Sequence, residues 1–115
     1  MSRNDALNDH VAKRQWEAKQ RGHEIAGTGW ISAVEAVAQG KNVLMVVPTR
    51  GDRHMLVAAM QGPLEDRKIK IARRRTTFNR IVLSNGTNIE IVSAAKGEAA
   101  LLGVSRETVL VFVYR

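Results

Sequence analysis

An uninterrupted run of apolar residues restricts the fold of this chain more than any other feature of its sequence. Val43 to Val47 places five apolar side chains in succession, and Pro48 ends the run. A strand with one face in water alternates apolar and polar residues, so a continuous run predicts a strand that is covered on both faces. Residues 109–113 form a second run of this kind. Such strands predict a three-layer domain with helices on each side of a sheet.

Helical patterns occupy the segments before and between these strands, because apolar residues recur there every three or four positions. The first helix carries a thin apolar stripe of Leu7, Val11 and Ala18. We expect it either to pack loosely on the domain through Leu7, Val11 and Trp16 or to serve as an arm for a partner. The buried stripe of the third helix is expected to contain Met55, Leu56, Ala59 and Met60. The predicted helices are residues 5–20, 30–39 and 53–60, which Gly22, Gly40 and Gly62-Pro63 are expected to end.

A β-hairpin is the clearest local prediction. Asn85-Gly86 joins the apolar segments 81–84 and 87–92, and both turn residues tolerate a positive φ. The alternation in Lys68-Ile69-Lys70-Ile71 predicts an edge strand whose basic face is exposed. Since helices and strands alternate before the hairpin, we expect a small α/β domain with a mainly parallel sheet. If the basic segment adds antiparallel strands, the class becomes α+β.

The chain is strongly basic. Eighteen Lys and Arg against eleven Asp and Glu give a net charge of +7. This charge favours a polyanionic partner, with sequence-independent and salt-sensitive contacts to nucleic-acid phosphates. A solvated surface explains a run of charges equally well, and two Phe, two Trp and one Tyr supply too few rings for a base-stacking platform. The candidate nucleic-acid-binding residues are Arg50, Arg53, Lys68, Lys70, Arg73, Arg74, Arg75 and Arg80.

A glycine-rich loop precedes the second predicted helix. Gly27, Thr28, Gly29 and Trp30 lie between a short apolar segment and that helix, which is the context of a phosphate-binding loop. In the P-loop pattern, however, Trp30 stands at the position of the phosphate-binding lysine, and Ile31 at that of the Mg²⁺-binding hydroxyl. The loop is therefore degenerate. We expect Trp30 to pack on a neighbouring strand, to fill the space of a phosphate or to stack on a base.

The order of these parts resembles the N-terminal half of a P-loop ATPase core. It is most similar to phage terminase large subunits and to related helicase-like packaging or replication proteins. The likeness covers roughly residues 22–115 and rests on the glycine loop, the strand running into Pro48-Thr49, the Asn-Gly hairpin, Leu102-Gly103 and the last apolar strand. The resemblance implies a three-layer, P-loop-like sheet with an added hairpin, and nucleic-acid backbone contacts at Arg50 and Arg53.

The chain differs from that family at the positions of the family's catalytic residues. Tyr114 and Arg115 occupy the places of the metal-binding and catalytic acidic residues, and the lysine and hydroxyl of the loop are replaced. Without these groups, metal-assisted phosphoryl transfer loses its charge clamp and its water-positioning base. The three histidines are far apart in the sequence. We therefore expect no catalytic residue, no metal site and no cofactor.

Three hypotheses about function follow from these patterns. The first is a non-catalytic, phage-type protein that binds DNA or RNA phosphates through its basic face. The second is a protein-interaction or assembly module that completes its sheet with a partner or a second copy of itself. The third is a nucleotide-binding remnant without hydrolysis.

In each hypothesis the chain consists of a polar N-terminal helix, residues 1–22, and a single domain, residues 23–115. No cysteine and no apolar run of membrane length occur in the sequence. We therefore expect a cytoplasmic protein with no membrane partner.

Overall fold

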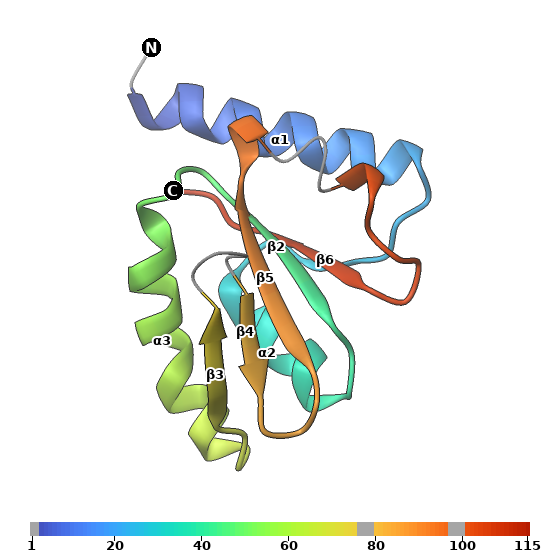
Figure 1. The fold of residues 1–115 in the computed structure, drawn as a ribbon. Coiled ribbons are helices and arrows are strands. Elements are labelled where there is room, and N and C mark those ends of the chain that lie inside the picture. The colour runs from blue at the N-terminus through green and yellow to red at the C-terminus, as the bar shows by residue number, and fades with distance from the viewer. Residues whose placement is uncertain (1–2, 76–79, 97–100) are drawn as a thin grey trace.

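A mixed β-sheet forms the middle layer of the protein (Figure 1). The computed structural model describes residues 3–75, 80–96 and 101–115. Its strands are β1 (Ile25–Gly27), β2 (Val43–Val47), β3 (Ile71–Arg75), β4 (Arg80–Leu83), β5 (Asn88–Ser93) and β6 (Val109–Phe112). In this part of the chain the six strands lie in the order β1-β6-β2-β5-β4-β3. β1, β6, β2 and β5 are mutually parallel, whereas β4 and β3 are antiparallel to their neighbours.

The fold therefore combines helices with a sheet that is parallel on one side and antiparallel on the other. Such a mixed sheet fits both the α/β class and the α+β alternative. None of the helices that the structure describes is long and apolar enough to cross a membrane.

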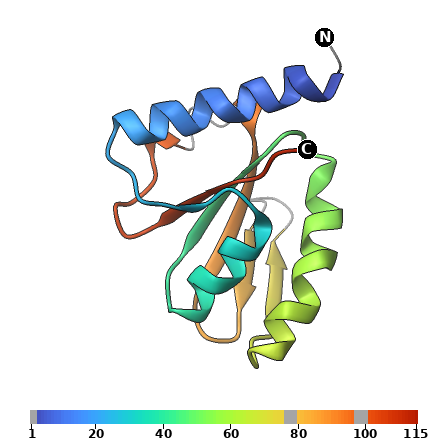
Figure 2. The same cartoon turned by 180° about the vertical axis from the view of Figure 1, so that it is seen from behind.

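The predicted burial of β2 on both faces is confirmed, because all five of its residues are buried. Its first, third and fifth side chains belong to the core under α2 (Trp30–Ala38) and α3 (Asp52–Asp66). Leu44 and Val46 belong to a second core, under α1 (Arg3–Gln20). Figure 2 shows α2 and α3 on one side of the sheet, and α1 packs on the other. One strand thus supplies alternate side chains to two cores.

α1 is a structural part of the domain rather than a loosely docked helix. Val11 and Ala18 are fully buried, and Arg14 between them is only 8% exposed. The Nε of Arg14 donates to the carbonyl oxygen of Ala94 at 2.8 Å, which ties the helix to the segment after β5. The prediction that Trp16 packs on the domain is wrong, since its side chain is 63% exposed. The buried stripe runs through positions 11, 14 and 18, and position 16 lies on another side of the helix.

α3 continues past the predicted stop at Gly62-Pro63 and ends at Asp66. Pro63 removes one N–H from the helix, but the burial of Leu64 keeps the last turn on the core. Met55 is 74% exposed, so its predicted burial is wrong. Leu56 and Met60 are buried as predicted, whereas Ala59 is exposed. The buried stripe runs through positions 56, 60 and 64, about one turn apart, and leaves position 55 beside it.

The chain leaves α3 at Lys68, whose φ of +59° is the left-handed conformation. The N–H of Ile69 donates to the carbonyl oxygen of Leu64 at 2.9 Å, and the N–H of Lys68 donates to that of Glu65 at 2.8 Å. These two bonds, with buried Ile69 against the helix end, form a Schellman motif. The segment predicted as an edge strand is therefore mostly a helix cap, and the edge strand itself is β3.

The predicted Asn85-Gly86 hairpin is confirmed and joins β4 to β5. Gly86 has a φ of +88°, and its N–H donates to the carbonyl oxygen of Leu83 at 3.0 Å. The Oδ1 of Asn85 accepts hydrogen bonds from the Thr87 N–H at 3.1 Å and from the Thr87 hydroxyl at 2.6 Å. The Nδ2 of Asn85 donates to the carbonyl oxygen of Val37 at 2.8 Å. One side chain thus shapes the turn and attaches it to the end of α2.

Replacing Lys68 with glycine should stabilise the protein. A residue with a Cβ costs about 1 kcal/mol in the left-handed conformation, and glycine avoids this cost at a helix end. We expect Lys68→Gly to raise the free energy of unfolding by about 0.5–1 kcal/mol in urea denaturation. Lys70→Gly removes the same charge at a position without positive φ and should lower stability. An equal drop in stability in the two variants would contradict the strain at Lys68.

Candidate functional site at the carboxyl ends of the parallel strands

Segments from four parts of the chain meet beyond the carboxyl ends of the parallel strands. In α/β sheets this edge is where ligands most often bind. Figure 1 shows the end of β2, the start of α3 and the segment after β6 close together, beside the first half of α1. The start of α2 lies at the same edge and shares a cavity with them. This carboxyl edge is the candidate site.

The glycine loop at this edge is a tight turn. Only Thr28 and Gly29 connect β1 to α2, and the N–H of Ser32 donates to the carbonyl oxygen of Gly29 at 3.0 Å. A Cβ built on Gly27 would lie 2.0 Å from the Ser32 Oγ. Glycine is therefore needed at position 27 so that the strand can approach the first turn of the helix closely.

Trp30 begins α2 and packs, partly buried, against the core under α2 and α3. The predicted packing of this residue is therefore confirmed. Trp30 also lines a cavity of about 330 Å³ that opens between α2, α3 and the segment after β6. The cavity is lined by Trp30, Pro48, Asp52, Met55, Leu56, Val113, Tyr114 and Arg115.

The side chain of Asp52 contributes a carboxylate to this cavity, and both of its oxygens accept hydrogen bonds. Its Oδ2 accepts from the Thr49 N–H at 3.1 Å and from the Thr49 hydroxyl at 3.0 Å. Its Oδ1 accepts from the Arg115 Nη2 at 2.7 Å. Burial raises the pKa of Asp52, but the hydrogen bonds from Arg115 and Thr49, with the charge of Arg115, outweigh it and lower the pKa below 3.8. The carboxylate is thus anionic and neutralised locally.

The segment after β6 is held between α1 and α3. The N–H of Arg115 donates to the Asn8 Oδ1 at 2.8 Å, and the Asn8 Nδ2 donates to the carbonyl oxygen of Arg115 at 3.0 Å. The Tyr114 hydroxyl is hydrogen-bonded to the Gln15 Oε1, and burial raises the pKa of this tyrosine. The amino-acid sequence does not reveal these contacts, because the partners are 99 and 107 positions apart. Tyr114 and Arg115 stood out there only as replacements of acidic residues.

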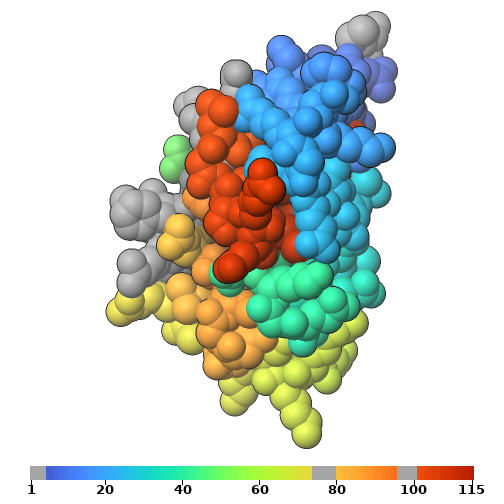
Figure 3. Space-filling view, turned by 90° about the vertical axis from the view of Figure 1, so that its right-hand side faces the viewer, coloured from blue at the N-terminus to red at the C-terminus, as the bar shows by residue number. Residues whose placement is uncertain are grey.

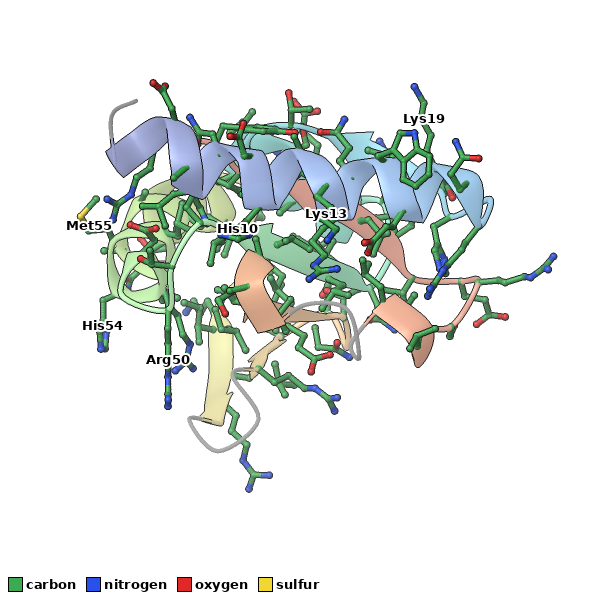
Figure 4. The ribbon with its side chains drawn as sticks, turned by 90° about the horizontal axis from the view of Figure 1, so that it is seen from above. His10, Lys13, Lys19, Arg50, His54 and Met55 are labelled. Atoms are coloured by element: carbon green, nitrogen blue, oxygen red, sulfur yellow. The ribbon has the colours of Figure 1, made fainter. Side chains whose placement is uncertain are left out.

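The predicted basic residues do not form one continuous face. Arg50, in the loop after β2, is exposed and projects away from the body of the protein (Figure 4). Arg53, in the first turn of α3, is half-buried, and its Nε has no hydrogen-bond partner among the described residues. Lys68 and Lys70 lie at the far end of α3, which has 15 residues and is therefore roughly 20 Å long. The two lysines are thus separated from the carboxyl edge.

A second basic group lies on β3 and β4. The Cα of Arg75 pairs with the Cα of Arg80 across the two strands, and exposed Arg73 lies on the same edge strand. On its other side Arg80 pairs with Glu90 of β5, and its buried Nε makes no hydrogen bond within the described chain. The side chains of Arg74 and Arg75 lie outside the described part of the structure. The sheet therefore gathers arginines at one antiparallel edge.

No group of three or more His, Asp or Glu side chains in the described residues is placed to hold a metal ion. The three histidines belong to different segments, with His10 on α1, His23 before β1 and His54 on α3. His10 and His54 lie far from each other in Figure 4. The functional groups that the described residues place at the carboxyl edge are the carboxylate of Asp52, which is paired with Arg115, the rings of Trp30 and Tyr114, and the exposed guanidinium of Arg50.

Asp52→Asn should make the protein less stable at neutral pH and less sensitive to acid. Since the folded-state pKa of Asp52 is lowered below 3.8, its carboxylate stabilises the fold above that pH and loses this effect as the pH falls below it. Urea denaturation at about pH 7 and about pH 3 should therefore give a larger drop in stability for the native chain than for Asp52→Asn. Asp66→Asn, an exposed position at the other end of α3, is the control. An identical pH dependence in all three proteins would contradict the role of the Asp52 contacts.

Comparison of the chain with models of protein families, with curated proteins and with solved structures found no match.

Proposed function

We propose that this protein binds nucleic acid without catalysing a reaction on it. The observation that carries the proposal is the pairing of β3 with β4 at the antiparallel edge of the sheet, which places the exposed Arg73 of the edge strand near the half-buried Arg80 of its neighbour. Glu90 of β5 pairs with Arg80 on its other side, so one acidic group faces this pair of arginines. Phosphate groups can bind such guanidinium groups and release counterions when they do. This edge is thus suited to the backbone of a nucleic acid.

Arg50 and Arg53 form a separate basic group at the carboxyl edge. Arg50 is exposed, whereas Arg53 is half-buried and its Nε is buried without a hydrogen-bond partner in the described chain. An exposed, planar guanidinium suits a phosphate oxygen, so Arg50 is the more accessible of the two. Lys68 is less suited, since its backbone caps α3 and it lies at the far end of that helix. Contacts of this kind go to the backbone of nucleic acid and carry no sequence information.

A degenerate, phage-type P-loop core is part of the same proposal. β1, the glycine turn, α2 and the buried β2 follow one another in the order that the terminase resemblance implies. Trp30, Ile31, Tyr114 and Arg115 replace the groups that would bind and cleave a nucleotide. In addition, Arg115 and Tyr114 are engaged with Asp52 and Gln15. These replacements support binding without catalysis.

The assembly hypothesis has a separate observation in its favour. β1 is at one edge of the sheet and pairs with β6 alone, so its outer edge has no neighbouring strand in the described part of the chain. However, β1 has three residues, which limits the number of backbone hydrogen bonds that a partner strand could add. Sedimentation at high protein concentration tests self-association. A strictly monomeric profile would remove the version in which a second copy completes the sheet.

Neutralising two arginines of the antiparallel edge tests the main proposal. We expect Arg73→Gln/Arg80→Gln to weaken binding of labelled single-stranded and duplex DNA in fluorescence anisotropy. The slope of log affinity against log salt concentration, between about 50 and 200 mM salt, should fall by about two units, because each arginine neutralises about one phosphate.

The matched control is Lys19→Gln/Arg21→Gln, which removes the same charge near the C-terminal end of α1. In Figure 4 Lys19 lies near the C-terminal end of α1, whereas Arg50, in the loop before α3, lies on the side of the N-terminal end of α1. The control should change affinity much less. Unchanged affinity in the arginine variant, or equal weakening in both variants, would refute a specific basic face. A response to Mg-ATP without one to DNA would favour the nucleotide remnant instead.

A further inference from the structure

The cavity at the carboxyl edge has walls that suit a flat aromatic ring. Trp30 and Tyr114 bring two aromatic side chains to it, and Pro48 and Leu56 add aliphatic surface. Met55 lines the rim and is 74% exposed although it is apolar. Aromatic rings and a methionine thioether interact favourably with aromatic groups. At about 330 Å³ the cavity also falls within the range of small-molecule sites.

The walls of this cavity are held in place by contacts from other elements. Hydrogen bonds to Gln15 and Asn8 of α1 fix Tyr114 and Arg115. Arg115 is also fixed by Asp52 of α3. A ligand that enters the cavity therefore needs to order few side chains, which lowers the cost of binding.

The charges around the cavity favour a ligand that also carries phosphate. Among the described side chains that line it, the carboxylate is that of Asp52, which is paired with Arg115 and Thr49 and so does not strongly oppose an approaching anion. Arg50 lies between two lining residues, Pro48 and Asp52, and is exposed. Figure 4 shows that Arg50, His54 and Met55 all project outward from the start of α3 and the loop before it. A phosphate chain that follows the loop between Pro48 and Asp52 would meet the guanidinium of Arg50 while an attached ring enters the cavity.

We propose that this cavity receives one unstacked nucleobase of a single-stranded nucleic acid, with the flanking phosphates at Arg50. The proposal rests on the nucleic-acid-binding function above and adds a base subsite to its phosphate contacts. Bases of a duplex are stacked inside the helix and cannot enter, so the subsite favours single strands. A peptide strand is a poorer occupant, because the cavity lies at strand ends, whereas the sheet edges that add strands are β1 and β3.

The test uses Trp30 as the reporter. In Trp16→Phe, which changes an exposed side chain on α1, Trp30 is the remaining tryptophan. This protein is titrated with a short oligothymidylate and with an abasic oligomer of the same length and charge. We expect the oligothymidylate to quench Trp30 and to bind about tenfold more tightly than the abasic oligomer, since stacking on an aromatic side chain accounts for about this factor.

Met55→Gln, made in the full-length chain, tests the wall of the cavity without changing charge. It should weaken oligothymidylate binding about threefold, and duplex binding should not change. Leu102→Gln is the matched control, since Leu102 is 65% exposed and lies in the segment beside the C-terminal end of α1 (Figure 3). This control should leave both affinities as they are.

Three outcomes would contradict the proposal, and each has a different meaning. Equal binding of both oligomers with unchanged Trp30 fluorescence removes the base subsite and leaves the phosphate contacts standing. No anisotropy change with any nucleic acid removes the nucleic-acid function as well. Quenching of Trp30 by a neutral phenylalanine-containing tripeptide, and by neither oligomer, assigns the cavity to a peptide partner.

Discussion

The burial of β2 on both faces determines the organisation of the rest of the structure. Five apolar side chains in succession cannot be satisfied by one layer of helix, because alternate residues point to opposite faces. α2 and α3 cover one face, and α1 covers the other. α1 is therefore indispensable although its sequence is mostly polar. Its buried Arg14 donates to the carbonyl oxygen of Ala94, so even the polar part of that helix contributes to the layer.

The elements that sequence predicted correctly are those specified by neighbouring residues. The run that forms β2 and the Asn85-Gly86 turn each carry their whole signal within a few positions. The end of α3 was missed because a buried Leu64 and a left-handed Lys68 outweigh the stop signal of Gly62-Pro63. The exposure of Trp16 was missed because α1 has few apolar residues, so its sequence does not reveal which of them face the core. The exposure of Met55 was missed because α3 carries an unbroken run of apolar residues, and the run extends around the helix beyond its buried face.

The candidate site depends on contacts between distant parts of the chain. Such contacts leave no repeating pattern in the sequence from which they could be predicted. Arg115 reaches Asp52 across 63 positions and Asn8 across 107. Sequence analysis could name Arg50 and Arg80 as basic residues, but not their separate places at the carboxyl edge and on the antiparallel edge. The sequence also places Trp30 after a glycine loop. Only the packing of four segments shows that this ring lines a cavity.

The position of β6 between β1 and β2 has a consequence for how the chain is assembled. Among the described strands β1 pairs with β6 alone, so it has no such neighbour until residues 109–112 have been synthesised, and the edge of β2 on that side remains open for the same period. β2 can pair earlier with β5, so the half of the sheet from β2 to β3 is able to form first. Insertion of a strand between two that precede it creates contacts of large sequence separation, which slows folding. The unpaired edge of an apolar strand is meanwhile a site for aggregation, and the net positive charge of the chain offsets this risk by mutual repulsion.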